Sequence, residues 1–178
     1  MPGSPSVTYV DSASDIGGGS SAWDNLGYLY AEDTNVAGAP TFVSSAYANT
    51  IECAFSGISV PSGSNIDGIS VRLVCRAQVK GGTPNFPIYC YLYYNSTEYG
   101  TGSAPPAIAS NTLTSYYAGG SSSLWSKGSW TTTELGSTLL HVKILNSSGV
   151  AGAVEIDVIE VSVYYSEASG ASFLQMFY

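Results

Sequence analysis

Apolar and polar residues alternate along much of this chain, which predicts β-strands with one buried face. The clearest alternation lies in residues 69–77, where every second side chain is apolar: Ile69, Val71, Leu73, Cys75 and Ala77. The positions between them include Arg72 and Arg76. We therefore predict a half-buried strand whose basic side chains lie on a solvated face.

The same period of two recurs in further segments, which are separated by clusters of Gly, Pro, Asn and Ser. Strands are predicted near residues 41–47, 50–55, 86–94, 139–145 and 154–165. Residues 100–120 are interpreted as a long connection, because Pro105-Pro106 and Gly119-Gly120 interrupt them. A count of about eight strands with almost no helix predicts one all-β domain, a single β-sandwich that is jelly-roll-like.

The last predicted strand changes its parity in the middle. One half places Val154, Ile156 and Val158 on a common face. The other half places its apolar residues on the opposite parity: Ile159, Val161, Val163 and Tyr165. A β-bulge between Val158 and Ile159 would keep both halves directed at the core, because it inserts one extra residue into the strand.

The two ends of the chain differ in composition from the middle. Residues 1–22 are rich in Ser and Gly and predict a flexible N-terminal arm, so the sandwich domain is assigned to residues 23–165. Residues 166–178 form a C-terminal linker and an apolar tail, whose large side chains are Phe173, Leu174, Met176, Phe177 and Tyr178. We expect this tail to bind a partner subunit; the alternative is that it folds back on its own domain.

Charge limits the classes of partner. Charged residues make up 10% of the 178 residues, against about 25% in ordinary soluble domains, and the formal net charge is −8. The low share of charged residues and the negative net charge disfavour nucleic acid as a partner. No apolar run is long enough to cross a membrane.

The start of the chain does not resemble a secretory leader, so we expect synthesis in the cytoplasm. Cys53, Cys75 and Cys90 are then expected to be buried reduced thiols, with one disulfide and a spare thiol as the alternative.

Catalysis needs reactive groups that converge, and the sequence offers few. His141 is the one histidine and lies in a strand pattern, so neither a zinc site nor a Ser-His-Asp set is predicted. We expect no enzymatic activity, no cofactor and no metal. Asp24, Glu32 and Asp33 lie near Trp23 and leave an ion or sugar site open as an alternative. A second acidic group in the last strand, Glu155, Asp157 and Glu160, is interpreted as the polar side of an edge strand.

Aromatic residues offer two further features. Tyr89, Tyr91 and Tyr93 line one face of the strand at 86–94. They form either an aromatic binding platform or an outer sheet face that a loop or a neighbouring subunit covers. Trp125 and Trp130 are expected to close one end of the core.

Several segments resemble a recurrent class of bacteriophage virion proteins. The resemblance includes Trp23-Asp24-Asn25, the stretch 55–69 that reads F-S-G-I-S-V-P-S-G-S-N-I-D-G-I, the pair Leu124-Trp125 with Trp130-Thr131, and the closing strand at 156–165. Proteins of this class look like jelly-roll or sandwich modules on phage heads and tails.

The resemblance implies a structural protein of the virion, made in the host cytoplasm. Within that class, a capsid decoration (cement) protein is expected. Its partners would be other virion proteins, the major capsid protein or tail proteins, and it would form a homo-oligomer for which the resemblance suggests a trimer. The alternatives are a tail, fibre or adaptor component, and a module that binds host glycans through its Tyr and Trp surfaces.

Overall fold

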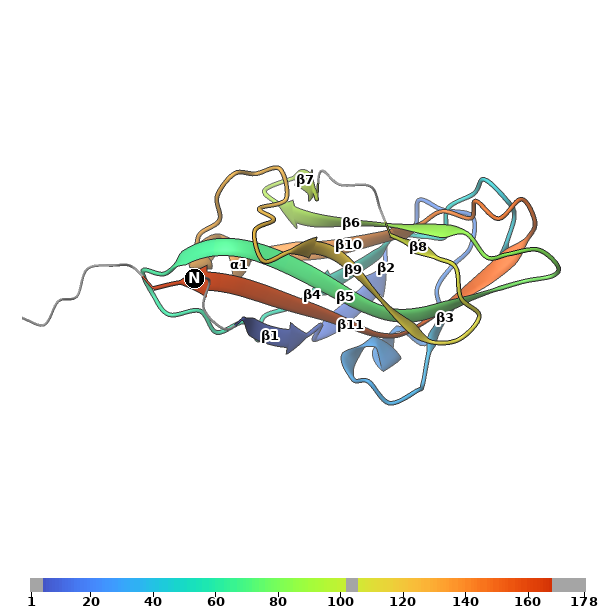
Figure 1. Ribbon diagram of the computed structural model, residues 1–178, viewed down its shortest axis with the longest axis horizontal. Coiled ribbons are helices and arrows are strands. Elements are labelled where there is room, and N and C mark those ends of the chain that lie inside the picture. The colour runs from blue at the N-terminus through green and yellow to red at the C-terminus, as the bar shows by residue number, and fades with distance from the viewer. Residues whose placement is uncertain (1–4, 102–105, 168–178) are drawn as a thin grey trace, which may run out of the picture.

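Two long antiparallel strands, β5 (Asn65–Val79) and β11 (Gly152–Ser166), pair along most of their length and form the middle of the first sheet. Figure 1 shows them as neighbouring ribbons that run the length of the molecule. The computed structural model describes residues 5–101 and 106–167. In this sheet β9 (Thr114–Gly120) flanks β5, and β1 (Ser6–Tyr9) and β3 (Ala37–Phe42) pair with different parts of β11.

The second sheet has six strands and packs face to face with the first. Five of its strands follow the order β2, β4, β10, β6, β7, and β8 pairs with the beginning of β6. Their bounds are β2 (Ser12–Asp15), β4 (Ile51–Ala54), β6 (Phe86–Tyr94), β7 (Thr97–Gly100), β8 (Ala107–Ile108) and β10 (Leu139–Ile144). The prediction of an all-β sandwich is confirmed.

Helical structure in the described part of the chain is limited to two short segments. The 3-10 helix η1 (Leu26–Tyr30) lies beside β2, β3 and β11, and buries Leu29. The helix α1 (Thr132–Leu135) begins with a capping box, in which the Thr131 side chain accepts from the Glu134 backbone N–H and Glu134 accepts from the Thr131 N–H. No helix among the described residues has the length and apolar character to span a membrane.

The core lies between the two sheets and is formed by the inward side chains of both. Trp125 and Trp130 are buried, and each indole N–H donates to a backbone carbonyl, Ile69 at 2.8 Å and Leu124 at 2.9 Å. The expected burial of both tryptophans is confirmed. Cys53, Cys75 and Cys90 are free and buried in this core, as predicted, and burial raises the pKa of the Cys90 thiol to about 12.

The parity change in β11 is caused by a bulge, one position earlier than predicted. Ile156 pairs with Cys75 and Val158 pairs with Val74, so Asp157 is the extra residue. Ile156 and Ile159 therefore both join the main core, whereas Val158 shares the outer face with Val74. The interpretation of this strand as an edge strand is wrong, because β11 has pairing strands on both sides.

The flexible arm predicted for residues 1–22 is wrong for the described part of that range. β1 pairs with β11 in the first sheet, and β2 pairs with β4 in the second. Between them the chain changes sheets, since Val10 donates to Ile159 of β11 and Asp11 donates to Ala54 of β4. This segment therefore closes one side of the sandwich.

Two other sequence interpretations need correction. The strand expected at 41–47 is β3, which ends at Phe42. The connection expected at 100–120 contains β8 and β9. The sequences of these two strands contain glycines and short polar runs and have no strong apolar alternation, so the pattern did not predict them. Their backbones form strands by pairing with β5 and β6. The tail at 173–178 lies outside the described residues.

Candidate functional site

The outer face of the six-stranded sheet gathers aromatic and charged side chains. In β6 the inward residues are buried, and Tyr89, Tyr91 and Tyr93 are directed outward because side chains alternate along a strand. The neighbouring strand β10 places Lys143 opposite Tyr89 and His141 opposite Tyr91. The outward side chains of β4, β6 and β10 thus form one polar and aromatic surface.

A groove lies on this face, and Tyr89 and Tyr91 are part of its lining. It has a volume of about 380 Å³ and is open to solvent, and its lining is Gly18, Tyr47, Ala48, Thr50, Tyr89, Tyr91 and Lys143. Tyr47 is 41% exposed, and its ring centroid lies 6.0 Å from that of Tyr89. A volume of this size is in the range of small-ligand sites.

One wall of the groove is the loop between β2 and Trp23. Asp15 anchors this loop, because its carboxylate accepts from the backbone N–H groups of Gly17 and Trp23, both at 2.8 Å, and from the Asn49 amide. Burial alone would raise the pKa of Asp15, but these hydrogen bonds outweigh it and the pKa is lowered. Sequence reasoning assigned this Gly-rich stretch to the arm and missed its place at the groove.

Polar groups converge on the rings. The Lys143 ammonium lies 4.8 Å from the Tyr91 ring centroid and donates to both carboxylate oxygens of Glu98, at 2.9 and 2.8 Å. Burial raises the pKa of Tyr91 above its ordinary value, and a tyrosine phenol is protonated at neutral pH even without this shift, so it can donate a hydrogen bond. Such a combination of apolar ring faces with a few placed polar groups is typical of small-molecule sites.

His141 is the centre of a second cluster on the same face. Its ring is buried and stacks on Tyr93, with centroids 4.6 Å apart and an angle of 17° between the planes. Its Nδ1 lies 2.7 Å from Glu98 Oε1, and its Nε2 lies 3.0 Å from Glu52 Oε2. Sequence reasoning read His141 as a simple strand residue, and its carboxylate partners come from β4 and β7.

Glu98 joins the two clusters, since it accepts from both Lys143 and His141. Burial would raise the pKa of Glu98, yet the hydrogen bonds from His141 and Lys143 and their charges outweigh burial and lower it. The carboxylate is therefore ionised near neutral pH. It fixes the position of Lys143 beside the groove.

The acidic candidates from the sequence do not form a common site. Glu32 pairs with Arg72 at 2.9 Å, Asp33 accepts from Asn35, and Asp24 pairs through its backbone with Gly38. Trp23 is buried and donates to the Asn49 carbonyl, so its ring is not available to a ligand. Among the described residues, no group of three His, Cys, Asp or Glu side chains has the geometry to hold a metal ion.

The basic residues Arg72 and Arg76 lie on the outer face of the five-stranded sheet. Arg72 pairs with Glu160 as well as with Glu32, and Arg76 pairs with Glu155. The sequence predicted a polar sheet face for these arginines, and this face is polar in the structure. Glu155 and Glu160 of β11 are their partners on it. Asp157 is instead buried at the bulge.

No protein-family model and no curated protein matches the chain. The fold is similar to that of the CBM22-1 xylan-binding domain of Paenibacillus barcinonensis Xyn10C, at 8% identity and a TM-score of 0.47, over 88% of each chain. It is also similar to a CBM4 structure, at 12% identity and a TM-score of 0.39, over 75% of this chain and 87% of that one.

A third similar structure contains the CBM22-1 and GH10 modules of Clostridium thermocellum xylanase Xyn10B, complexed with xylohexaose. Its identity is 10% and its TM-score 0.46, over 94% of this chain and 29% of that one. This chain thus spans under a third of that structure's length. At such identities the likeness concerns the β-sandwich fold alone.

Proposed function

We propose that the chain is a glycan-binding module whose binding surface is the outer face of the six-stranded sheet. The observation that carries this proposal is the groove in which Tyr47, Tyr89 and Tyr91 lie beside Lys143. Sugar rings present C–H faces that pack on aromatic rings, and hydroxyl groups that bond to neighbouring polar side chains. The groove offers both kinds of contact on one open surface.

Charge favours a sugar over a nucleic acid as the ligand. Bases also stack on tyrosine, but the sites that bind them are lined with unpaired cations. Here Lys143 is already matched by Glu98, Glu52 lies on the same face, and the formal net charge is −8. A phosphate backbone would be repelled from this surface.

Binding to a panel of polysaccharides and immobilised glycans tests the proposal. Wild-type protein should bind at least one member, and the double variant Tyr89→Ala/Tyr91→Ala should bind it at least about tenfold more weakly, a loss of about 1.4 kcal/mol. Tyr117→Ala is the matched control, because Tyr117 is a 59% exposed tyrosine of β9 in the other sheet. Equal affinity of the double variant and the control would contradict the proposal.

A structural role in a phage virion is the second proposal. The sequence resemblance leads to this proposal. Two features support it, the low charge of the chain and the exposed apolar side chains of Val7 and Tyr9 on β1, because both suit contact with neighbouring protein. The two roles are compatible, because a virion surface protein is exposed to host glycans. A cryo-EM map of the intact particle would show or exclude this sandwich on the head or tail.

A further inference from the structure

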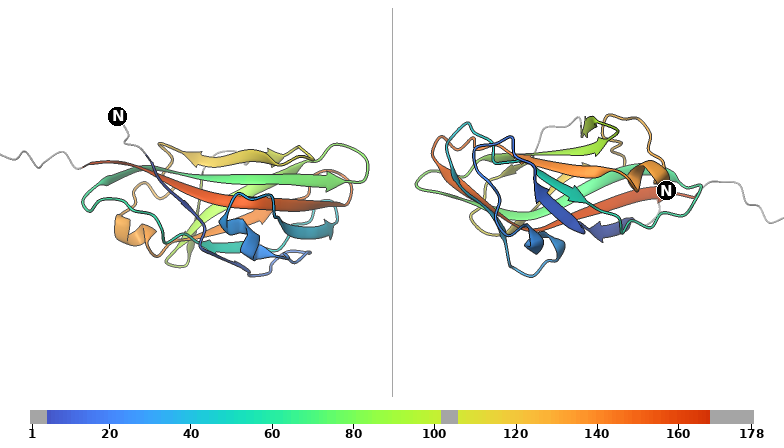
Figure 2. Two further views of the ribbon diagram at one scale, coloured as in Figure 1. Left: turned by 90° about the horizontal axis from the view of Figure 1, so that it is seen from below. Right: turned by 180° about the vertical axis from the view of Figure 1, so that it is seen from behind.

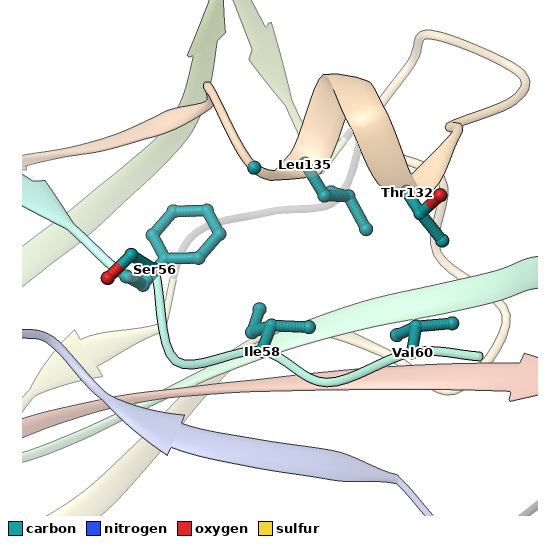
Figure 3. A pocket seen from close by; sticks show the side chains of 7 residues that line it. Ser56, Ile58, Val60, Thr132 and Leu135 are labelled. Carbon is teal, nitrogen blue, oxygen red and sulfur yellow. The ribbon is translucent and has the colours of Figure 1, made fainter. Parts of the chain in front are cut away.

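A slot opens between α1 and the loop 55–64, at one end of the sandwich and away from the groove. Its walls are mainly apolar and include Phe55, Ile58, Val60, Thr132 and Leu135. Figure 3 shows Ile58 and Val60 directed from the loop toward the helix, with Leu135 and Thr132 directed back toward them. The slot has a volume of about 60 Å³ and is partly open to solvent.

The described chain ends at the same end of the sandwich as this slot. β11 finishes at Ser166, which pairs with Asn65, and the loop 55–64 leads directly into Asn65. The views in Figures 1 and 2 agree that α1 and the end of β11 lie at the same end of the sandwich. Six residues, 167–172, separate Ser166 from Phe173 and can span about 20 Å when extended. The apolar segment at 173–178 is therefore within reach of the slot.

We propose that the slot receives a large apolar side chain from the segment 173–178 of the same chain. Five of these six residues are apolar or aromatic, and each side chain of this kind gains about 1.5–3 kcal/mol on full burial. A short linker gives the segment an effective concentration in the millimolar range. That value exceeds the concentration of a second copy in ordinary solutions, which favours the chain's own domain over a partner subunit as the acceptor.

Methyl NMR on the full-length protein tests this inference. The chain has two methionines, Met1 and Met176, so labelled methionine methyls give two signals, and truncation after Ser172 assigns one of them. In a sample that sedimentation shows to be monomeric, the Met176 methyl should differ from an unstructured methionine. Truncation should shift the methyl signals of Ile58, Val60 and Leu135, and lower the Tm by about 2–4 °C.

Two variants separate docking from general effects on the fold. Val60→Asp places a carboxylate in the slot and should return the Met176 signal to its unstructured position. Val43→Asp is the control, because Val43 is 63% exposed in the segment after β3 and the charge change is the same. A tail variant, F173D/F177D, leaves the slot intact and should give the same methyl shifts as truncation.

Two results would overturn the inference. One is an unstructured Met176 signal together with slot methyls that do not respond to truncation or to F173D/F177D. The other is a set of docking shifts that appears only at concentrations where the protein dimerises, since the acceptor would then be a second copy. Glycan binding is independent of this test, because the groove lies on a different face.

Discussion

The carboxylate of Asp157 accepts a hydrogen bond from the backbone N–H of Thr34, with the oxygen and nitrogen 2.9 Å apart. Asp157 is the bulge residue of β11 and is 2% exposed, and Thr34 lies in the loop after η1 with a φ of 70°. The bond joins positions 123 residues apart in the chain. A bulge in the central strand thus holds a loop with strained backbone against the sheet.

Asp157→Ala should lower the free energy of unfolding by about 2 kcal/mol, because the loop N–H groups lose a buried acceptor. Asp157→Asn keeps an acceptor oxygen at this position and should cost less. Asp24→Ala is the control, since Asp24 is exposed and its hydrogen bonds are made by its backbone. Urea denaturation measures the free energy of unfolding of each variant. An Asp157→Ala variant as stable as the control would contradict this prediction.

His141→Ala should also destabilise the protein, by about 2 kcal/mol. The substitution removes a buried ring that stacks on Tyr93, and it leaves the carboxylates of Glu52 and Glu98 without that partner. Because Glu98 positions Lys143, glycan affinity should fall together with stability. Thermal melting and the binding assay measure both effects; a variant with unchanged stability would show that the cluster is an incidental arrangement.

The lowered pKa of Glu98 predicts how stability depends on acid. The folded state holds its carboxylate ionised to a lower pH than the unfolded chain, whose ordinary value is 4.5. The stabilisation is therefore complete above that value and is lost as the pH falls through the lower folded pKa. Asp15 contributes in the same direction.

Chemical denaturation between pH 3 and pH 7 measures this dependence. Wild-type protein should lose stability below about pH 4.5, and Glu98→Gln should flatten part of that loss. A Glu155→Gln variant serves as the control on the other sheet, where Glu155 pairs with Arg76. Identical pH profiles for wild type and Glu98→Gln would refute the assignment.

Gly19→Ala should disturb the wall of the groove. A Cβ at this position would lie 2.2 Å from the carbonyl carbon and oxygen of Ala48, so the backbone must move. We expect a loss of about 1–3 kcal/mol in stability and weaker glycan binding. Gly27→Ala is the matched control, because its Cβ would meet no atom within 4 Å. Equal behaviour of the two variants would argue against the close contact.

The strands with strong apolar alternation could be predicted from the sequence, and so could the bulge. Residues 69–77 and 86–94 lie in β5 and β6, and the parity change in 154–165 marked the bulge to within one position. β1 and β2 could not be predicted in this way. Their sequences, SVTY and SASD, contain few apolar residues, and pairing with distant strands orders them.

The candidate site was only partly visible in the sequence. The period of two in β6 identified Tyr89, Tyr91 and Tyr93 as one face, and left open whether they bind a ligand. The polar partners could not be found, because Glu52, Glu98 and His141 are brought together by strand register across separations of 43 and 89 residues. A single sequence gives no information on such register.

The most direct measurement of the central claim is the position of a bound glycan. Backbone NMR spectra of ¹⁵N-labelled protein, titrated with the tightest-binding oligosaccharide, should show the largest shift changes in β6, β10, the loop 16–19 and residues 47–50. Signals of β5, β9 and β11 should change little. Shift changes centred on the five-stranded sheet, or no change with any oligosaccharide of the panel, would contradict a glycan site on the tyrosine face.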